Sequence, residues 1–327
     1  MIIYKPYEER TPDRQYALAL ARTLPRERQR ALFIRNRYSE LPWGEPDIES
    51  EYTKNPFQTH GTYTNLALPP LVYDLANGIP LITERKISFW RKFIAEIIAF
   101  INGARTLAEL RAYGSEKTWA NFWEEWWTPE KCAQFGLAPG DGGPGGYGPA
   151  YHGYRSAGGE GFNQVLAVIE QVRNYPGLRT HMMTTWKPDL CMGTRDRPRQ
   201  VVVAPCHGSL VKLTVIGNEL TLTHVQRSCD LPVGAVGNIF QYPVLGMMFA
   251  QVLGLTFRRY VHYFIDGQIY ENQIPWVEEL VQREPRRFPT LRITDPTITD
   301  IFAFRPEHFE LSDYDPHPAM NDIPVTN

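Results

Sequence analysis

The stretch "VVVAPCHGSLVKLTV", residues 201–215, places a cysteine and a histidine at an Ala-Pro turn, directly before a segment that alternates like a strand. Cysteine is most often a small core hydrophobe. At the junction of a turn and a strand, however, Cys206 can be presented as a nucleophile. The alternation runs over residues 208–226 and predicts a hairpin that turns at "IGNE".

Other segments show the periods of helices and strands. The apolar residues of 87–104 recur at helical spacing, and helices are also expected over residues 13–33, 162–174 and 239–254. Short strands are expected from residue 62 onward and in "RRYVHYFID". This order of elements predicts an α+β fold, with a mixed or mostly antiparallel sheet packed against apolar helices.

Length and composition argue against several classes of protein. The 327 residues suit one large domain or two small ones, and 43% hydrophobic residues are enough for a core. The net charge of −2 predicts no nucleic-acid partner, and no uninterrupted apolar run reaches the roughly 18 residues of a membrane span. Because the N-terminus becomes charged too early for a secretory signal, we expect a cytoplasmic protein without a membrane partner.

The four cysteines are read from their spacing. They form no C-x-x-C pair and no zinc-finger spacing with histidine. We therefore expect free thiols and no metal site. For Cys132, Cys191 and Cys229 a core position is the better interpretation.

Several motifs follow Cys206 in a specific order. "QRSCDLPVGAVGN", residues 226–238, begins with an Arg-Ser pair suited to anions and ends with a side-chain amide. "IYEN", "REPRRFP" and the terminal "FELSDYDPHPA…IPV" come next. With "APCH", these motifs make the chain resemble the folate-dependent thymidylate synthase family from about residue 60 to the end.

The resemblance implies a fold, a domain organisation and a reaction. It implies a thymidylate synthase-like fold in which one sheet face forms the interface of a homodimer. Residues 51–327 would form the catalytic domain, and residues 1–50, rich in Arg, Glu and Pro, would be an N-terminal extension packed on it. The implied partners are a pyrimidine nucleoside monophosphate and 5,10-methylenetetrahydrofolate. Since carbon 5 of the pyrimidine is a poor nucleophile, Cys206 would add to carbon 6, and the resulting enolate would attack the methylene group.

The resemblance also implies roles for individual residues. Glu96 would order water and assist proton transfer, Tyr151 would help remove the C5 proton, and His207 would act through ordered water. The implied nucleotide contacts are Arg179, Arg227, Ser228, Asn238, Gln268 and Tyr270. The implied folate contacts are Trp123, Asp230, Gly234 and Val325, the last in a tail that closes over the ligands. Without the resemblance, Glu96 is interpreted as a helix-edge carboxylate and Trp123 as a core aromatic residue. Trp123 can be a core residue and a folate contact at the same time.

Some positions depart from the family pattern. The family collects four arginines on the phosphate, but Thr180 follows Arg179, and the early arginine falls at or near Gln58. The nearest substitutes in the sequence are His60, His181 and Arg155. Elsewhere the ribose-binding histidine is replaced by Gln268, the usual Pro-Phe by Val236-Gly237, and the "YGxQWR" stretch by "YHGYR". These changes predict a divergent member with an altered sugar, phosphate or one-carbon outcome.

Three functions remain open on the sequence. The leading expectation is reductive methylation of dUMP to dTMP, and the alternative is 5-hydroxymethylation of dUMP, dCMP or CMP, in which water replaces hydride. A non-catalytic, RNA-binding homologue is a third interpretation. Asn238 favours uracil, because an amide can accept from N3–H and donate to O4, whereas family members that act on cytosine tend to carry aspartate there.

Overall fold

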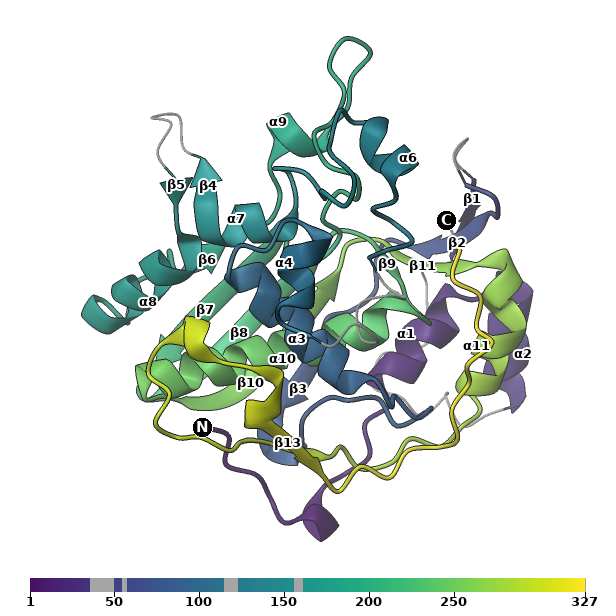
Figure 1. The fold of residues 1–327 in the computed structure, drawn as a ribbon. Helices are drawn as coiled ribbons and strands as arrows, with labels where there is room; N and C mark the ends of the chain where they lie inside the picture. Colours follow the sequence, from purple (N-terminus) through teal and green to yellow (C-terminus); the bar gives the residue numbers. More distant parts are fainter. Residues whose placement is uncertain (36–49, 55–57, 115–122, 156–160, 327) are drawn as a thin grey trace.

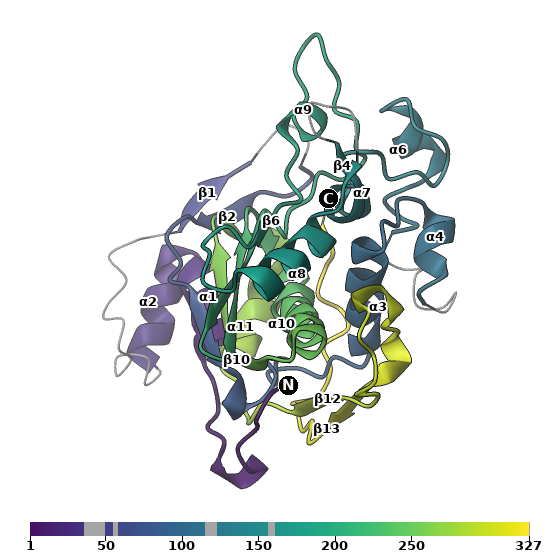
Figure 2. The same cartoon turned by 90° about the vertical axis from the view of Figure 1, so that its left-hand side faces the viewer.

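The computed structural model describes residues 1–35, 50–54, 58–114, 123–155 and 161–326. A sheet, a buried helix and a second helix lie one behind the other, as the two views show (Figures 1 and 2). The helices are α1 (Gln15–Thr23), α2 (Arg26–Arg35), α3 (Trp90–Ile101), α4 (Leu107–Arg111), α6 (Pro129–Ala133), α7 (Tyr147–Gly153), α8 (Gln164–Asn174), α9 (Pro188–Cys191), α10 (Gly234–Leu253) and α11 (Ile274–Leu280).

The larger sheet has five strands in the order β3-β10-β8-β7-β6. These are β3 (Leu71–Asp74), β10 (Thr256–Phe264), β8 (Glu219–Gln226), β7 (Leu210–Ile216) and β6 (Met182–Met183). β7 and β8 form the predicted hairpin, and β10 pairs with β8 in parallel after the crossover through α10. The remaining pairs are antiparallel, so the prediction of an α+β fold with a mixed sheet is confirmed.

A second sheet has the order β1-β2-β11-β9 and lies beside the first. Its strands are β1 (Glu51–Thr53), β2 (Thr62–Asn65), β11 (Gly267–Tyr270) and β9 (Cys229–Asp230). Two small ribbons complete the sheets, β12 (Thr290–Ile293) with β13 (Phe309–Ser312) and β4 (Tyr154–Arg155) with β5 (Gly161–Phe162). Because β9 directly follows β8, the "QRSCD" motif passes from one sheet to the other.

Helix α10 is the centre of the core. It is apolar on all sides, 17 of its residues are buried, and it lies between the larger sheet and α3 (Figure 2). It is the one helix in the described ranges that is long and apolar enough to cross a membrane, but 89% of that window is buried inside the protein, as in a core helix. The helix begins at Gly234 rather than at the expected residue 239, so Asn238 lies on the helix and not before it.

The expected single helix over residues 13–33 is wrong in one respect. The segment forms two helices, α1 and α2, separated at Leu24 and Pro25. Proline disfavours helical backbone at the preceding residue, and Leu24 is accordingly extended, with φ −61° and ψ 158°. The chain therefore ends α1 here and starts α2 at Arg26.

The first residues of the chain are tied to the main body. The Phe257 backbone N–H donates to the Met1 carbonyl at 2.9 Å, at the start of β10. The Arg10 side chain is 4% exposed and donates to the Phe288 carbonyl and to Thr290 Oγ1. A buried guanidinium with satisfied donors fixes this segment against the ribbon that carries β12.

Candidate active site

Cys206 lies on the loop that enters β7, and hydrogen bonds to its carbonyl groups hold this loop on both sides. Its carbonyl accepts from the Arg227 backbone N–H at 2.9 Å, and the His207 carbonyl accepts from Thr185 Oγ1 at 2.8 Å. Gly208 follows with φ +66°, and a Cβ there would stand 2.3 Å from Tyr151 Oη. Glycine is therefore required, and the loop presents the half-buried Cys206 in one conformation.

The Cys206 thiol has two neighbours that favour its ionised form. Tyr147 Oη lies 3.4 Å from Sγ, and the Cys206 backbone N–H donates to the same oxygen at 2.9 Å. Burial raises the pKa of the thiol, while the hydrogen bond with Tyr147 and the positive charge of Arg227 lower it. The arrangement suits a nucleophile whose thiolate is shielded from water.

Arg227 faces the turn that carries the cysteine. Its Nε and Nη2 donate to the carbonyls of Pro205 and Ala204, at 2.9 and 3.1 Å. Its guanidinium also lies over the Trp186 ring. Arg199 is close enough for the charge of Arg227 to lower its pKa, although burial is the larger cause. Two guanidinium groups therefore stand near each other, which suits a dianion.

His207 belongs to a buried aromatic group. Burial lowers the pKa of this imidazole to about 3, so the ring is neutral at neutral pH. Nδ1 lies 2.8 Å from Tyr242 Oη, which lies 3.1 Å from Tyr151 Oη. The imidazole also stacks on the Tyr147 ring, with centroids 4.2 Å apart. His207 and Tyr151 are thus linked through Tyr242, a residue that the sequence did not indicate.

Glu96 lies in the middle of α3 and is 7% exposed. Oε1 accepts from Trp123 Nε1 at 2.7 Å, and Oε2 accepts from Gln241 Nε2 at 2.6 Å. Burial raises the pKa of the carboxyl to about 7, because the two hydrogen bonds offset it only in part. A carboxyl that titrates near neutral pH can both give and take a proton. The interpretation of Glu96 as a solvated helix-edge residue is wrong, since the side chain is buried.

Asn238 lies one turn into α10, between two glutamines. Oδ1 accepts from Gln226 Nε2 at 2.8 Å, and Nδ2 donates to Gln241 Oε1 at 3.4 Å. Gln241 cannot turn round freely, because its Nε2 donates to both Glu96 and the Phe93 carbonyl. The Glu96 carboxylate therefore orients Gln241, and Gln241 in turn orients the N–H side of the Asn238 amide.

The other side is oriented by a chain of buried hydrogen bonds. The Gly208 backbone N–H donates to His224 Nε2 at 2.8 Å, so the proton of this ring is on Nδ1, which faces Tyr260 Oη at 3.3 Å. Tyr260 then donates to His262 Nδ1, and His262 Nε2–H donates to Gln226 Oε1, both at 3.0 Å. Burial lowers the pKa of both imidazoles, to about 3 for His262, which keeps the rings neutral. Gln226 consequently presents its N–H group to Asn238.

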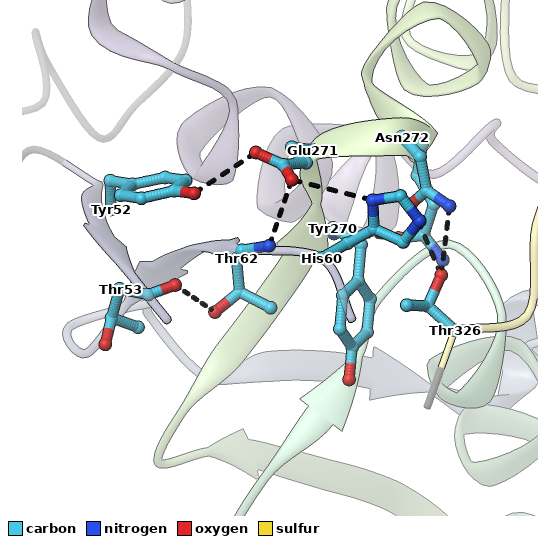
Figure 3. A network of polar contacts seen from close by, with 10 residues as sticks. Tyr52, Thr53, His60, Thr62, Tyr270, Glu271, Asn272 and Thr326 are labelled. Atoms are coloured by element: carbon cyan, nitrogen blue, oxygen red, sulfur yellow. Dashed lines mark hydrogen bonds and ion pairs between the residues drawn. The ribbon is translucent and has the colours of Figure 1, made fainter. Parts of the chain in front are cut away.

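Asp230 and the end of the chain form the other wall of the site. Burial raises the pKa of Asp230 to about 7, and Gln273 Nε2 donates to its Oδ2 at 3.0 Å. Gln273 also donates to the Pro324 carbonyl at 2.8 Å. Thr326 and Asn272 bond to each other, as Figure 3 shows. The tail is thus anchored beside Tyr270, whereas the Val325 side chain is 66% exposed.

The expected ribose contacts lie together on β11. Gln268 Nε2 donates to Ser228 Oγ at 3.2 Å and to Asp266 Oδ2 at 2.8 Å. Tyr270 is half-buried at the end of the strand, and burial raises the pKa of its phenol. Gly234, an expected folate contact, is the first residue of α10, with 4.0 Å between an added Cβ and Cys229 Sγ.

Arg179, an expected phosphate contact, and the three candidates for the missing phosphate arginines lie in different environments. Arg179 is exposed in the segment between α8 and β6. His181 is fully buried, with Nε2 at 3.1 Å from the Tyr175 carbonyl, so the suggestion that it binds phosphate is wrong. His60 Nδ1 lies 3.5 Å from one oxygen of Glu271, and Tyr52 donates to the other oxygen from the opposite side (Figure 3). The Arg155 side chain lies outside the described part of the structure.

Besides Tyr242 and Arg199, other residues of the site were not predicted as such. Gln226 stood inside a quoted motif, and Gln241 is three residues from Asn238, a spacing that shares a helix face. Tyr147 lies in the Gly-rich stretch, which has no periodicity to read. Cys132, Cys191 and Cys229 are buried free thiols, as expected for core cysteines.

Comparison with known proteins agrees with this geometry. The family model described as thymidylate synthase matches residues 48–325, nearly the whole chain. The match defines an enzyme class, the one-carbon transferases that act on carbon 5 of pyrimidine nucleotides with a methylenetetrahydrofolate cofactor. The chain belongs to the thymidylate synthase family, which confirms the resemblance drawn from its motifs.

Proposed function

We propose that this protein methylates carbon 5 of dUMP, with 5,10-methylenetetrahydrofolate as the donor and Cys206 as the nucleophile. The observation that carries the proposal is the convergence of Cys206, Glu96 and Asn238 around the start of α10, with both carboxylate oxygens and both amide groups oriented by buried partners.

The orientation of the Asn238 amide supports uracil as the base. Each amide group has one hydrogen bond within the protein, which leaves one lone pair on Oδ1 and one hydrogen on Nδ2. Uracil offers a complementary N3–H and O4. Cytosine would require the Asn238 amide to rotate by half a turn. The Asn238 N–H group would then face the N–H group of Gln226, and two donors would oppose each other.

The burial of the site supports hydride rather than water as the second reactant. Trp123 donates to one oxygen of Glu96 and Gln241 to the other, and the Glu96 and Trp123 side chains are each only 7% exposed. Each carboxylate oxygen retains a lone pair, through which Glu96 can exchange a proton with the pyrimidine. The low exposure limits the access of bulk water to the substrate.

The phosphate and the sugar have matching groups nearby. Arg227 and Arg199 supply two positive charges, and Arg199 Nε has no hydrogen-bond partner among the described residues. Gln268 Nε2 donates to Ser228 and to Asp266. Its Oε1 would therefore accept a hydrogen bond from a ribose hydroxyl.

The residues also fit the folate. Asp230 is a half-buried carboxyl with one partner on each oxygen, and it retains acceptor capacity for the N–H groups of a pterin ring. Trp123 offers an aromatic surface beside Glu96. When bound, the cofactor supplies the one-carbon unit and the hydride. Asp230 would hold the ring, and the anchored tail would exclude water.

The chain's own residues would act in sequence on the nucleotide. The Cys206 thiolate would form a bond to carbon 6. Negative charge would then develop on O4, and a proton on Glu96 would stabilise it. After the carbon unit is transferred, Tyr151, through its link with Tyr242 and His207, would help to remove the proton from carbon 5. Cys206 would then leave carbon 6 as the thiolate.

The test is mass spectrometry of the products formed from dUMP, UMP, dCMP and CMP, each with methylenetetrahydrofolate. We expect a methyl gain on dUMP and formation of dihydrofolate. A hydroxymethyl gain would contradict the hydride step and favour the alternative, 5-hydroxymethylation. Product formation mainly from dCMP or CMP would contradict the assignment of the base.

A further inference from the structure

The Tyr147 hydroxyl contacts Cys206 twice. Its oxygen accepts from the Cys206 backbone N–H at 2.9 Å and lies 3.4 Å from the sulfur. We propose that Tyr147 is a further catalytic residue, whose hydroxyl donates a hydrogen bond to the Cys206 thiolate and so favours ionisation of the nucleophile. The inference rests on Cys206 being the nucleophile of the proposed function.

The direction of the hydrogen bond follows from the backbone contact. A backbone N–H can only donate, so it occupies a lone pair of the phenol oxygen and leaves the O–H group to point elsewhere. The sulfur is the second atom within reach of this oxygen. A thiolate can only accept, and therefore the hydrogen bond stabilises the ionised form over the thiol.

The phenol is held rigidly in this position. Tyr147 is the first residue of α7 and is 3% exposed. Its ring packs against both Phe100 and His207, with centroids 4.6 and 4.2 Å away, and meets Trp123 edge-on at 6.2 Å. Since the ring cannot turn away, the hydroxyl is preorganised at the sulfur before the substrate binds.

The Tyr147 hydroxyl and the Arg227 charge stabilise the thiolate in different ways. Arg227 provides a positive charge, but it directs Nε and Nη2 to the carbonyls of Pro205 and Ala204. Burial raises the pKa of the Tyr147 phenol well above its usual value, so the group remains a donor. The Tyr147 O–H group would stabilise the thiolate in two steps of the reaction: before it attacks carbon 6 and when it leaves carbon 6.

The test measures the ionisation of Cys206 in the absence of nucleotide and folate. The rate of alkylation by iodoacetamide is followed against pH, with the Cys206 peptide quantified by mass spectrometry, in the wild type and in Tyr147→Phe. Because the thiolate is the reactive form, we expect the apparent thiol pKa to rise and alkylation below that pKa to slow by about tenfold. The matched control is Tyr151→Phe, a buried phenol on the same helix that bonds to Tyr242, and it should leave the thiol pKa unchanged.

The outcomes separate this inference from the proposed function. An unchanged profile in a folded Tyr147→Phe variant would overturn the inference, as would an equal shift in the control. If that variant does not fold, Tyr147→Met, which also lacks a donor but adapts to irregular space, takes its place under the same criterion. A shifted profile in a protein that transfers no carbon to any pyrimidine nucleotide would support the hydrogen bond and overturn the proposed function.

Discussion

Gln226 Nε2 lies 2.8 Å from Asn238 Oδ1, and this contact fixes which end of the asparagine amide carries the oxygen. The orientation of Gln226 is itself determined by His262, which donates to its Oε1, and by the Ser228 carbonyl, which accepts from its Nε2 at 3.2 Å. The Asn238 amide, which we propose reads the base, is therefore connected to the loop after Cys206 through buried side chains of β8 and β10.

The first prediction concerns the base. Asn238→Asp should shift preference from uracil toward cytosine, because a carboxyl at this position can accept from the amino group and share a proton with N3. We expect the ratio of kcat/KM for dUMP over dCMP to fall by a factor that corresponds to roughly 1–3 kcal/mol. Steady-state kinetics with both nucleotides provide the measurement. A wild-type enzyme that already prefers the cytosine nucleotide would contradict the prediction.

The second prediction concerns the covalent step. Cys206→Ala should reduce kcat by roughly four orders of magnitude or more, since the bond to carbon 6 cannot form. The nucleotide Kd should change little, because the groups proposed to hold the ligand remain. Calorimetric titration with dUMP measures binding, and Cys229→Ala, at a buried thiol that is not proposed to react, is the control for turnover. Measurable turnover by the Cys206 variant would mean that another residue is the nucleophile.

The third prediction concerns pH. Burial raises the pKa of Glu96 to about 7, so the carboxyl is protonated below that pH and charged above it. If the proton on Glu96 stabilises O4, kcat/KM should fall as the pH rises through about 7. Glu96→Gln should remove this limb and lower kcat by roughly 10²–10⁴-fold. The control is Glu84→Gln, at another buried carboxyl whose pKa burial raises to about 7, and it should retain the wild-type profile. If kcat/KM of Glu96→Gln still falls as the pH rises through about 7, another group is responsible for the pH dependence.

The sequence predicted the parts of this protein that short motifs or regular periods encode. The β7–β8 hairpin and helix α3 follow from alternation and helical spacing. The burial of Glu96 does not, because it depends on Trp123 and on Gln241, which is 145 positions away in the chain. Such contacts arise only when α10 packs on α3.

The residues that sequence reasoning missed share a physical cause. Tyr147 acts at the end of a glycine-rich loop, whose path is set by close packing, such as that of Gly148 on the Ala104 carbonyl, rather than by local propensity. His181 looked available for phosphate but is fully buried, since residues near a short edge strand carry no clear pattern of exposure. The break at Pro25 was readable, because proline restricts the residue before it.

The fourth prediction concerns the phosphate. Arg199→Gln should raise the KM for dUMP by about 10- to 100-fold, as expected for loss of one charge-assisted hydrogen bond of about 1.5–3 kcal/mol. Binding of deoxyuridine, which has no phosphate, should be unaffected. The control is Arg197→Gln, an exposed arginine in the same loop. Equal losses for dUMP and deoxyuridine would indicate a structural role for Arg199 instead.

One face of the larger sheet is turned away from α10. A row of residues in register crosses all five strands on this face. It consists of Val72, Val261, Thr223, Lys212 and Met182. Val72 at one end is 43% exposed and Met182 at the other is 45% exposed, and Tyr263 and Ile265 nearby are also exposed. Exposed apolar groups on a broad sheet face favour association with a second copy.

The last prediction is that this face forms a homodimer, which would also allow the exposed Arg179 to reach the phosphate site of the partner. Thr223 lies on the central strand β8, so Thr223→Arg would place a charge from each subunit near the middle of the interface, where it would lose its hydration. We expect sedimentation at micromolar concentration to show a dimer for the wild type and a monomer for this variant, with loss of turnover. Thr299→Arg, on an exposed loop elsewhere, should remain a dimer. A monomeric wild type with full activity would rule out both the interface and the role of Arg179 across it.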